Sequence, residues 1–363
     1  MKIALLAPFE ERVPPRKYGG TENVVYVLAE ELHKMGHDVT VFASGDSTLS
    51  ARVIPIVPTA IGSGLPKRIR EAKTYQALVK VLQYLEKEKF DILHNHIGWQ
   101  ALNFKDMFKL PFLSTIHLPL GAKEWNIEHE MFKEFGDTPL VSISDDQRTP
   151  LPDLNYIETV YHGMQVERFP FIKRAGHYLA FLGRLSPVKG PLEAIHIAKK
   201  TGHKLMIGAK INDFERDFYE KEIKPHIDGE QIVYLGELNF KDKLNLLKNA
   251  KALLSPIKWS EPFGLVNTEA MACGTPVIGS NIGSLPELIV DGKTGFICDT
   301  VDEMCKRVHQ LDSINRAACR EHIEENFSSE RMAQQYLRLY RKLARSFKLK
   351  HIEPVSKLNR KLI

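Results

Sequence analysis

Cysteine is scarce in this sequence, which has four cysteines in 363 residues and no C-x-x-C pair. This number and spacing predict neither a disulfide framework nor a zinc site, and they favour a reducing cytoplasm. Long apolar runs are missing too, since none approaches the roughly 20 residues of a membrane-spanning helix. Hydrophobic residues still make up 43% of the chain and charged residues 26%, which is typical of a soluble globular protein.

Three signatures of nucleotide or metal binding are also absent. The first strand is not followed by G-x-G-x-x-G, so only the fold class supports a nicotinamide oxidoreductase. The sequence has no G-x-x-x-x-G-K-[ST] P-loop and no D-x-D triplet that could hold a divalent cation beside a diphosphate. The nearest acidic pair, Asp145-Asp146, has no recognisable partners in the sequence. We therefore expect neither a cofactor nor a metal.

Acidic residues almost disappear from the end of the chain. Residues 338–363 contain nine Lys or Arg residues and one acid, a net charge of +8, whereas the whole chain carries +5, so the rest sums to −3. We therefore do not expect a general nucleic-acid-binding body. Because Leu339, Leu343 and Phe347 interleave with the cations, one interpretation of this tail is peripheral contact with an anionic membrane.

Short β-rich runs alternate with helical patterns along the chain. Helical spacing is clearest in Thr21–Lys34, Lys67–Lys87, Leu192–Lys200 and Lys241–Asn249. The expected strands begin near Lys2, Asp38, Val53, Asp91, Phe112, Leu140 and Thr159, and in a second series near Tyr178, Lys204, Ile232, Ala252, Pro276 and Phe296. Two such series predict two doubly wound α/β domains, with ligands near the carboxyl ends of the strands. The pattern lapses over Gly163–Gly176, where we expect the domain boundary.

The most informative stretch is Ser260–Gly274, which follows the apolar strand Ala252–Ser255. It contains a turn with Pro262 and Gly264, and then a helical pattern. A strand, a glycine-containing turn and a helix N-terminus favour an anion site, because free N–H groups and the helix dipole point towards it. Glu261 and Glu269 flank this turn, eight positions apart. The alternative is two solvated glutamates beside an ordinary loop.

Three other segments are weaker candidates. Arg184 and Lys189 lie five positions apart in a loop bracketed by glycines, which suits a diphosphate, although two solvated cations would give the same pattern. Gly19-Gly20 precedes a helix and either lets a ligand approach the backbone or makes a turn. His117 ends an expected strand, where a packed histidine is the alternative to a ligand-binding one.

Taken together, these segments resemble the retaining glycosyltransferases of family 4. The matching features are, in chain order, the Gly-Gly loop, the histidine that ends a middle strand, Gly-Arg-x-x-x-x-Lys-Gly and Glu-x₇-Glu. The stretch Ile278–Phe296 also resembles the C-terminal half of the family. This resemblance implies the GT-B fold, which has two Rossmann-like doubly wound domains facing a central cleft. One departure is Asn267-Thr268, where the family often has two apolar residues.

The resemblance also implies a division of labour. Residues 1–165 would form the acceptor domain, 166–335 the nucleotide-sugar domain, and 336–363 a helix and basic tail that packs back on the first domain. Arg184 and Lys189 would bind the diphosphate of the donor, Glu261 the transferred sugar, and Glu269 the ribose. The remaining donor contacts would come from His117 near the reacting centre and from Gly19, Gly20, Glu237, Leu238, Phe263, Gly264 and Leu265.

The implied activity is the retaining transfer of a hexosyl group from a UDP- or GDP-sugar to a hydroxyl acceptor such as a glycan, a glycolipid or a small molecule. A GT-B nucleotide-sugar epimerase and a non-catalytic nucleotide-sugar-binding protein are the alternatives. Acceptor choice would reside in the loops Glu10–Tyr18, Ile97–Asn103 and Leu118–Phe135, which carry no recognisable signature.

Overall fold

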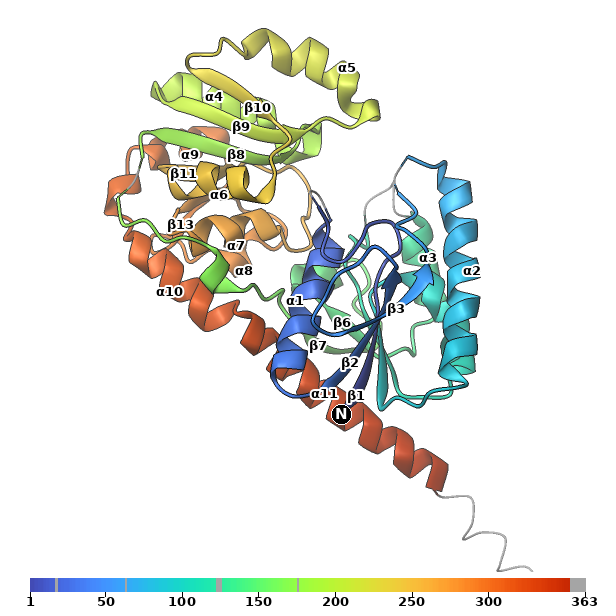
Figure 1. The fold of residues 1–363 in the computed structure, drawn as a ribbon. Coiled ribbons are helices and arrows are strands. Elements are labelled where there is room, and N and C mark those ends of the chain that lie inside the picture. Colours follow the sequence, from blue (N-terminus) through green and yellow to red (C-terminus); the bar gives the residue numbers. More distant parts are fainter. Residues whose placement is uncertain (17–18, 63, 122–125, 175, 353–363) are drawn as a thin grey trace, which may run out of the picture. The chain divides into compact units, whose positions relative to one another are not determined.

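A computed structural model describes residues 1–16, 19–62, 64–121, 126–174 and 176–352 (Figure 1). The chain forms two units. Unit 1 contains the described residues of Met1–Ile143, Pro150–Gly163 and Ser329–Ile363, and unit 2 contains those of Ser144–Thr149 and Met164–Ser328. This division differs from the sequence-based one because Ser144–Thr149 belongs with unit 2 and the start of the last helix belongs with unit 1.

Unit 1 is built on a parallel sheet of seven strands in the order β3-β2-β1-β4-β5-β6-β7. The strands are β1 (Lys2–Leu6), β2 (Asp38–Ser44), β3 (Arg52–Val57), β4 (Ile92–Asn95), β5 (Phe112–Thr115), β6 (Leu140–Ser142) and β7 (Tyr156–Thr159). The helices are α1 (Gly20–Lys34), α2 (Lys67–Leu85), α3 (Asn126–Glu134) and α11 (Ser329–Ile352), with a 3-10 segment over Trp99–Met107. The order reverses between β1 and β4, so the loops after these strands lie at a topological switch point.

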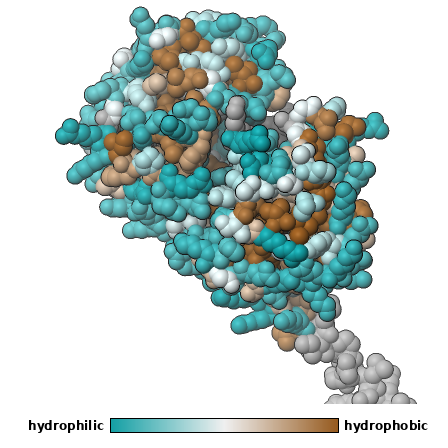
Figure 2. Space-filling model, viewed as in Figure 1, coloured by the Kyte–Doolittle hydropathy of each residue, from teal (hydrophilic) through white to brown (hydrophobic). Residues whose placement is uncertain are grey.

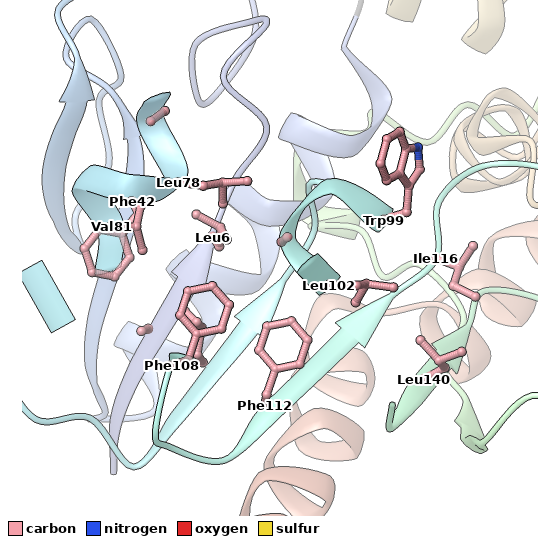
Figure 3. Close-up of a cluster of buried hydrophobic side chains, with 14 of the residues drawn as sticks. Leu6, Phe42, Leu78, Val81, Trp99, Leu102, Phe108, Phe112, Ile116 and Leu140 are labelled. Carbon is pink, nitrogen blue, oxygen red and sulfur yellow. The ribbon is translucent and has the colours of Figure 1, made fainter. Parts of the chain in front are cut away.

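Helices cover both faces of this sheet, as expected for parallel strands. The helices α1 and α11 pack on one face, while α2 and α3 cover the other (Figure 1). Figure 3 shows the second interface, where Leu6, Phe42 and Phe112 of the sheet belong to the same buried cluster as Leu78 of α2. The rings of Phe108 and Phe112 stack there with centroids 5.4 Å apart. These strands are therefore buried, which explains their continuous apolar runs.

Unit 2 contains a parallel sheet of six strands in the order β10-β9-β8-β11-β12-β13. Its strands are β8 (Tyr178–Arg184), β9 (Lys204–Lys210), β10 (Ile232–Gly236), β11 (Ala252–Ser255), β12 (Val277–Ser280) and β13 (Gly295–Cys298). Its helices are α4 (Pro191–Thr201), α5 (Arg216–Phe218), α6 (Phe240–Lys248), α7 (Leu265–Ala272), α8 (Leu285–Leu288), α9 (Val301–Val308) and α10 (Arg316–Asn326). The switch point of this sheet lies between β8 and β11, which pair in parallel.

The predicted α/β class with two doubly wound sheets is confirmed. One predicted strand start is wrong, because Thr159 is the last residue of β7 rather than its first. All four residues of β7 are only partly buried, and its pairing with β6 shifts register. An edge strand of this kind has no buried apolar run to mark its beginning.

The last helix, α11, is amphipathic. Its inner stripe is formed by Met332, Ala333, Tyr336, Leu337 and Tyr340, all nearly inaccessible to solvent, and this stripe packs on unit 1. The outer face carries the cations Arg341, Lys342 and Arg345, which are partly or fully exposed. Residues 353–363 of the basic tail lie outside the described residues, so membrane contact through it stays a prediction. Among the described helices, none is both long and apolar enough to span a bilayer.

The face of the molecule drawn in Figure 2 is predominantly polar. Figure 2 shows hydrophilic residues over most of the visible face, with apolar residues in separate patches. The largest apolar exposures include Phe214 at 78%, Leu349 at 67% and Met107 at 58%. Single exposed apolar side chains of this kind are ordinary on folded proteins.

Candidate functional site

The loop between β11 and α7 carries the two glutamates that the sequence singled out. Gly264 caps α7 with a φ of 79°, in the left-handed region. A Cβ on Gly264 would lie 2.7 Å from Nδ2 of Asn267 and 3.3 Å from Cγ of Glu261. Both the backbone conformation and the space therefore require glycine. The turn brings Glu261 close to the N-terminus of α7.

Asn267 and Thr268, the two residues at which the chain departs from the family pattern, have local hydrogen-bond partners. Both are almost completely buried. The backbone N–H and Nδ2 of Asn267 donate to the Gly264 carbonyl at 2.9 and 3.0 Å, and Oγ1 of Thr268 donates to the Leu265 carbonyl at 2.8 Å. These side chains thus bond to the first turn of the helix, which is how Asn and Thr commonly act near helix starts.

Glu261 is ion-paired with Lys189. Its carboxylate also accepts a hydrogen bond from Nε1 of Trp259 at 2.9 Å, and Nζ of Lys189 lies 5.1 Å from the centroid of the Trp259 ring. Lys189 ends a short 3-10 helix after β8. Gly190 follows it with a φ of 73°, and a Cβ there would lie 1.9 Å from the Pro256 carbonyl oxygen. This close packing joins the loop after β8 to the loop after β11.

Arg184 and Glu269 have partners that the sequence analysis missed. Arg184 ends β8, with Nη1 3.6 Å from Oε1 of the buried Glu215. Glu215 belongs to a capping box with Asn212, and the pattern N-x-x-E could have revealed it. Glu269 pairs with Lys243 of α6 at 2.5 Å. Each of the three glutamates therefore neutralises a cation in this part of unit 2.

The remaining donor-site candidates of unit 2 lie in the segments that follow the carboxyl ends of β10 and β11. Leu238 follows β10 and covers Gly208 of β9, where a Cβ would lie 2.6 Å from the leucine Cδ1. Glu237 lies between this leucine and Gly236, the last residue of β10. Phe263 is buried and its carbonyl accepts a hydrogen bond from Oγ of Ser284 at 2.7 Å.

In unit 1, Gly19 and Gly20 lie at the start of α1, after β1. Gly19 caps the helix, and a Cβ there would lie 2.6 Å from Cβ of Pro15 and 3.2 Å from Oε2 of Glu22. The glycine is therefore needed because any side chain at this position would clash with the Pro15 ring. Burial raises the pKa of Glu22 to about 7, and the nearby charges of Glu10 and Glu11 act in the same direction.

His117, which follows β5, is partly buried and forms a cluster with the buried His94, His96 and His162. Its Nε2 lies 2.9 Å from Nδ1 of His96, and its ring stacks on that of His162 with centroids 5.2 Å apart. Burial lowers the pKa of His117 to about 3. The pKa values of His94, His96 and His162 also fall well below the ordinary value because of burial. These imidazoles are therefore neutral at physiological pH.

His94 joins this cluster to α11. Its Nδ1 lies 2.7 Å from the Tyr340 hydroxyl and its Nε2 lies 2.7 Å from Oγ1 of Thr115, which in turn contacts the Tyr336 hydroxyl at 2.9 Å. Among the residues that the structure describes, no group of three or more His, Cys, Asp or Glu side chains is arranged to hold a metal ion.

Comparison with protein families matches both halves of the chain. Residues 167–326 match the model described as "Glycosyl transferases group 1", and residues 18–137 match "Glycosyltransferase Family 4". A glycogen synthase of Mycobacterium tuberculosis is 27% identical over an alignment that covers 78% of this chain and 80% of the relative. The spore coat protein SA of Bacillus subtilis is 27% identical, with coverage of 94% and 100%. A D-inositol 3-phosphate glycosyltransferase of Mycolicibacterium smegmatis is 24% identical, with coverage of 93% and 90%.

Solved structures show the same fold. A sucrose-phosphate synthase from Thermosynechococcus elongatus superposes with a TM-score of 0.81 at 19% identity, covering 95% of this chain and 100% of that chain. HepE of Anabaena, solved in complex with UDP and glucose, gives a TM-score of 0.71 at 18% identity, with coverage of 94% and 100%. The family matches and this shared two-sheet architecture lead to one conclusion: the chain is a GT-B glycosyltransferase of the family 4 type.

Proposed function

We propose that this protein transfers a hexosyl group, with retention of configuration, from a nucleoside-diphosphate sugar to a hydroxyl acceptor. The observation that carries the proposal is the arrangement at the switch point of the unit 2 sheet. Arg184 ends β8 and Lys189 follows it, and Glu261 and Glu269 follow β11, the neighbouring strand. HepE of Anabaena, a structural relative, has been solved with UDP-glucose, which supports a nucleotide-sugar donor here.

The Lys189–Glu261 ion pair suggests how the donor is received. A diphosphate that approaches the N-terminus of α7 meets Lys189, Arg184 and the free amides of the helix. As its charge engages Lys189, the Glu261 carboxylate becomes available to accept hydrogen bonds from sugar hydroxyls. Glu269 accepts hydrogen bonds from the ribose in the same way, with Lys243 holding its carboxylate.

In the transfer step, the bond between the anomeric carbon and the phosphate oxygen breaks, and its electron pair goes to the leaving diphosphate. The acceptor oxygen bonds to the anomeric carbon on the same face, and its proton passes to a phosphate oxygen. Negative charge therefore gathers on the diphosphate, which Arg184, Lys189 and the amide dipoles stabilise. His117, as a neutral imidazole, forms a hydrogen bond with the sugar. This proposed step uses no protein nucleophile, metal or cofactor.

A donor panel tests the proposal. The protein is incubated in EDTA with UDP-, GDP- and ADP-sugars, and the release of nucleoside diphosphate by transfer or slow hydrolysis is measured. We expect release from one class of donor, lowered at least a hundredfold by Arg184→Ala or Lys189→Ala, as is usual for the loss of a group that stabilises transition-state charge. Activity that EDTA abolishes and Mg²⁺ or Mn²⁺ restores would contradict the metal-free mechanism.

The same incubation distinguishes the alternatives. An epimerase would convert a nucleotide-sugar in the absence of any acceptor, and analysis of the recovered sugar would show its epimer. A binding protein without activity would retain affinity for the donor but release no diphosphate.

A further inference from the structure

The segment Ser144–Thr149 follows β6 of unit 1 but belongs with unit 2, and the chain returns to unit 1 at Pro150. It contains Asp145-Asp146, the acidic pair for which the sequence offered no partner. A short 3-10 helix over Asp146–Arg148 gives the segment its shape, and the Ser144 hydroxyl accepts a hydrogen bond from the Gln147 N–H at 3.2 Å. The segment is therefore ordered by its own turn.

Two residues of unit 2 bind this segment. The carboxylate of Glu287, on α8, accepts the backbone N–H of Asp145 and of Asp146, each at 2.8 Å. The Ser260 hydroxyl donates to the Asp146 carboxylate. Bidentate acceptance by one carboxylate fixes orientation as well as position.

Ser260 directly precedes Glu261, so these contacts reach the sugar-binding loop. On its other side the loop is held by Ser284, whose backbone N–H donates to the Glu261 carbonyl at 3.0 Å. Gly283 packs so closely that a Cβ there would lie 2.5 Å from the Glu261 nitrogen. The backbone at Glu261 is thus fastened between the α8 region and Asp146.

We infer that Asp146 and Glu287 are positioning residues, which orient the Glu261 carboxylate for the transferred sugar through Ser260. The Glu261 carboxylate is bound by Lys189 and Trp259. The direction of the side chain between these partners depends on the position of the loop backbone. Small displacements of a substrate-binding group have large effects on rate. This inference rests on the proposed function, because it assigns a purpose to the geometry of the same site.

A double-mutant cycle on Ser260→Ala and Asp146→Ala tests the inference, with acrylamide quenching of Trp259 as the reporter. Trp99→Phe and Trp125→Phe in the background leave Trp259 as the only emitter. We expect each variant to raise quenching and to lower kcat by roughly tenfold to a hundredfold, with KM and nucleotide affinity nearly unchanged. The double variant should be no worse than either single one, because both remove the same hydrogen bond.

Ser260→Thr, which keeps the hydroxyl, should restore both readouts, and Asp153→Ala, an exposed acid close by in the sequence, serves as the matched control. Asp146→Asn is a gentler variant with an intermediate expected effect, used if Asp146→Ala lowers the melting temperature. Unchanged quenching, additive effects in the double variant, or an equal loss of nucleotide affinity would overturn the inference. A wild-type protein that transfers no sugar would refute the proposed function, while the quenching cycle would still decide the positioning role.

Discussion

At the scale of single residues, the site differs from the sequence-based prediction mainly in the partners of its charged side chains. Sequence reasoning assigned Lys189 to the diphosphate and Glu261 to the sugar, yet the two side chains form an ion pair with each other. The same holds for Glu269, which is held by Lys243. Pairing of this kind lowers the cost of burying each charge and keeps the site close to neutral before a charged donor binds.

The two glutamates should separate in a binding experiment. Glu261→Ala should depress turnover far more than affinity for the free nucleoside diphosphate, because, of the proposed contacts with the donor, it removes only those with the sugar. Glu269→Ala should weaken nucleotide binding by roughly 1.5–3 kcal/mol, about 10- to 150-fold in Kd, through the loss of charge-assisted hydrogen bonds. Calorimetric titration with the nucleotide checks this.

The control is Lys243→Met, which removes the partner of Glu269 and leaves the carboxylate in place. A similar loss of nucleotide affinity in the Glu261 and Glu269 variants would argue against the assigned roles.

Glu22 should make the stability of unit 1 depend on pH. Its pKa is about 7 in the folded protein and 4.5 for an unperturbed glutamate, so the folded state holds the proton more tightly. Its contribution to stability is full below pH 4.5 and is lost as the pH rises through 7. Glu22→Gln should therefore raise the free energy of unfolding at pH 8 by up to about 3 kcal/mol, and by little at pH 5. Urea unfolding at both pH values measures the difference, and an equal gain at both would contradict the assignment.

At the scale of elements, local patterns located the regular structure and long-range pairing completed the site. Four predicted helices agree within two residues with α1, α2, α4 and α6, because amphipathic spacing is a local property of the sequence. The pairs Arg184–Glu215 and Lys189–Glu261 bring together residues 31 and 72 positions apart. No local pattern encodes such contacts, so the sequence located the loops but not the ion pairs within them.

The buried histidines give unit 1 a second pH dependence, opposite in sign to that of Glu22. Because burial lowers the pKa values of His94, His96, His117 and His162, the unfolded chain takes up protons below pH 6.5 that the folded state refuses. The free energy of unfolding should fall below that pH, by up to about 1.4 kcal/mol per pH unit for each histidine. Below pH 6.5 the combined effect of the four histidines on the free energy of unfolding exceeds the opposite effect of Glu22.

Urea unfolding between pH 7.5 and 5.5 measures this slope, with Trp99 as the reporter of unit 1 and the other two tryptophans replaced by phenylalanine. His94→Asn should reduce the slope and also weaken the docking of α11, since it loses the Tyr340 contact. His177→Asn, which changes an exposed histidine, should leave the slope as it is. Unfolding that does not vary with pH in this range would refute a neutral cluster.

At the scale of the whole molecule, each unit places its candidate residues at the carboxyl ends of its own sheet. In unit 1 the Gly19-Gly20 loop follows β1 and His117 follows β5, and in unit 2 the charged residues lie at the end of β8 and in the segments that follow β8 and β11. Sequence alternation could predict both sheets, and the switch-point rule then predicts where ligands bind. It could not predict that Ser144–Thr149 belongs with unit 2, because that grouping depends on contacts with Ser260 and Glu287.

We propose that sugar passes from a nucleotide donor with its anomeric configuration retained. The most direct measurement is proton NMR of the sugar that the protein first releases from an α-linked donor, recorded before mutarotation. We expect the α-anomer, at a rate that EDTA does not change and that Glu261→Ala strongly lowers. Initial release of the β-anomer would show inversion, and either that result or no release from any donor would refute retaining transfer by this protein.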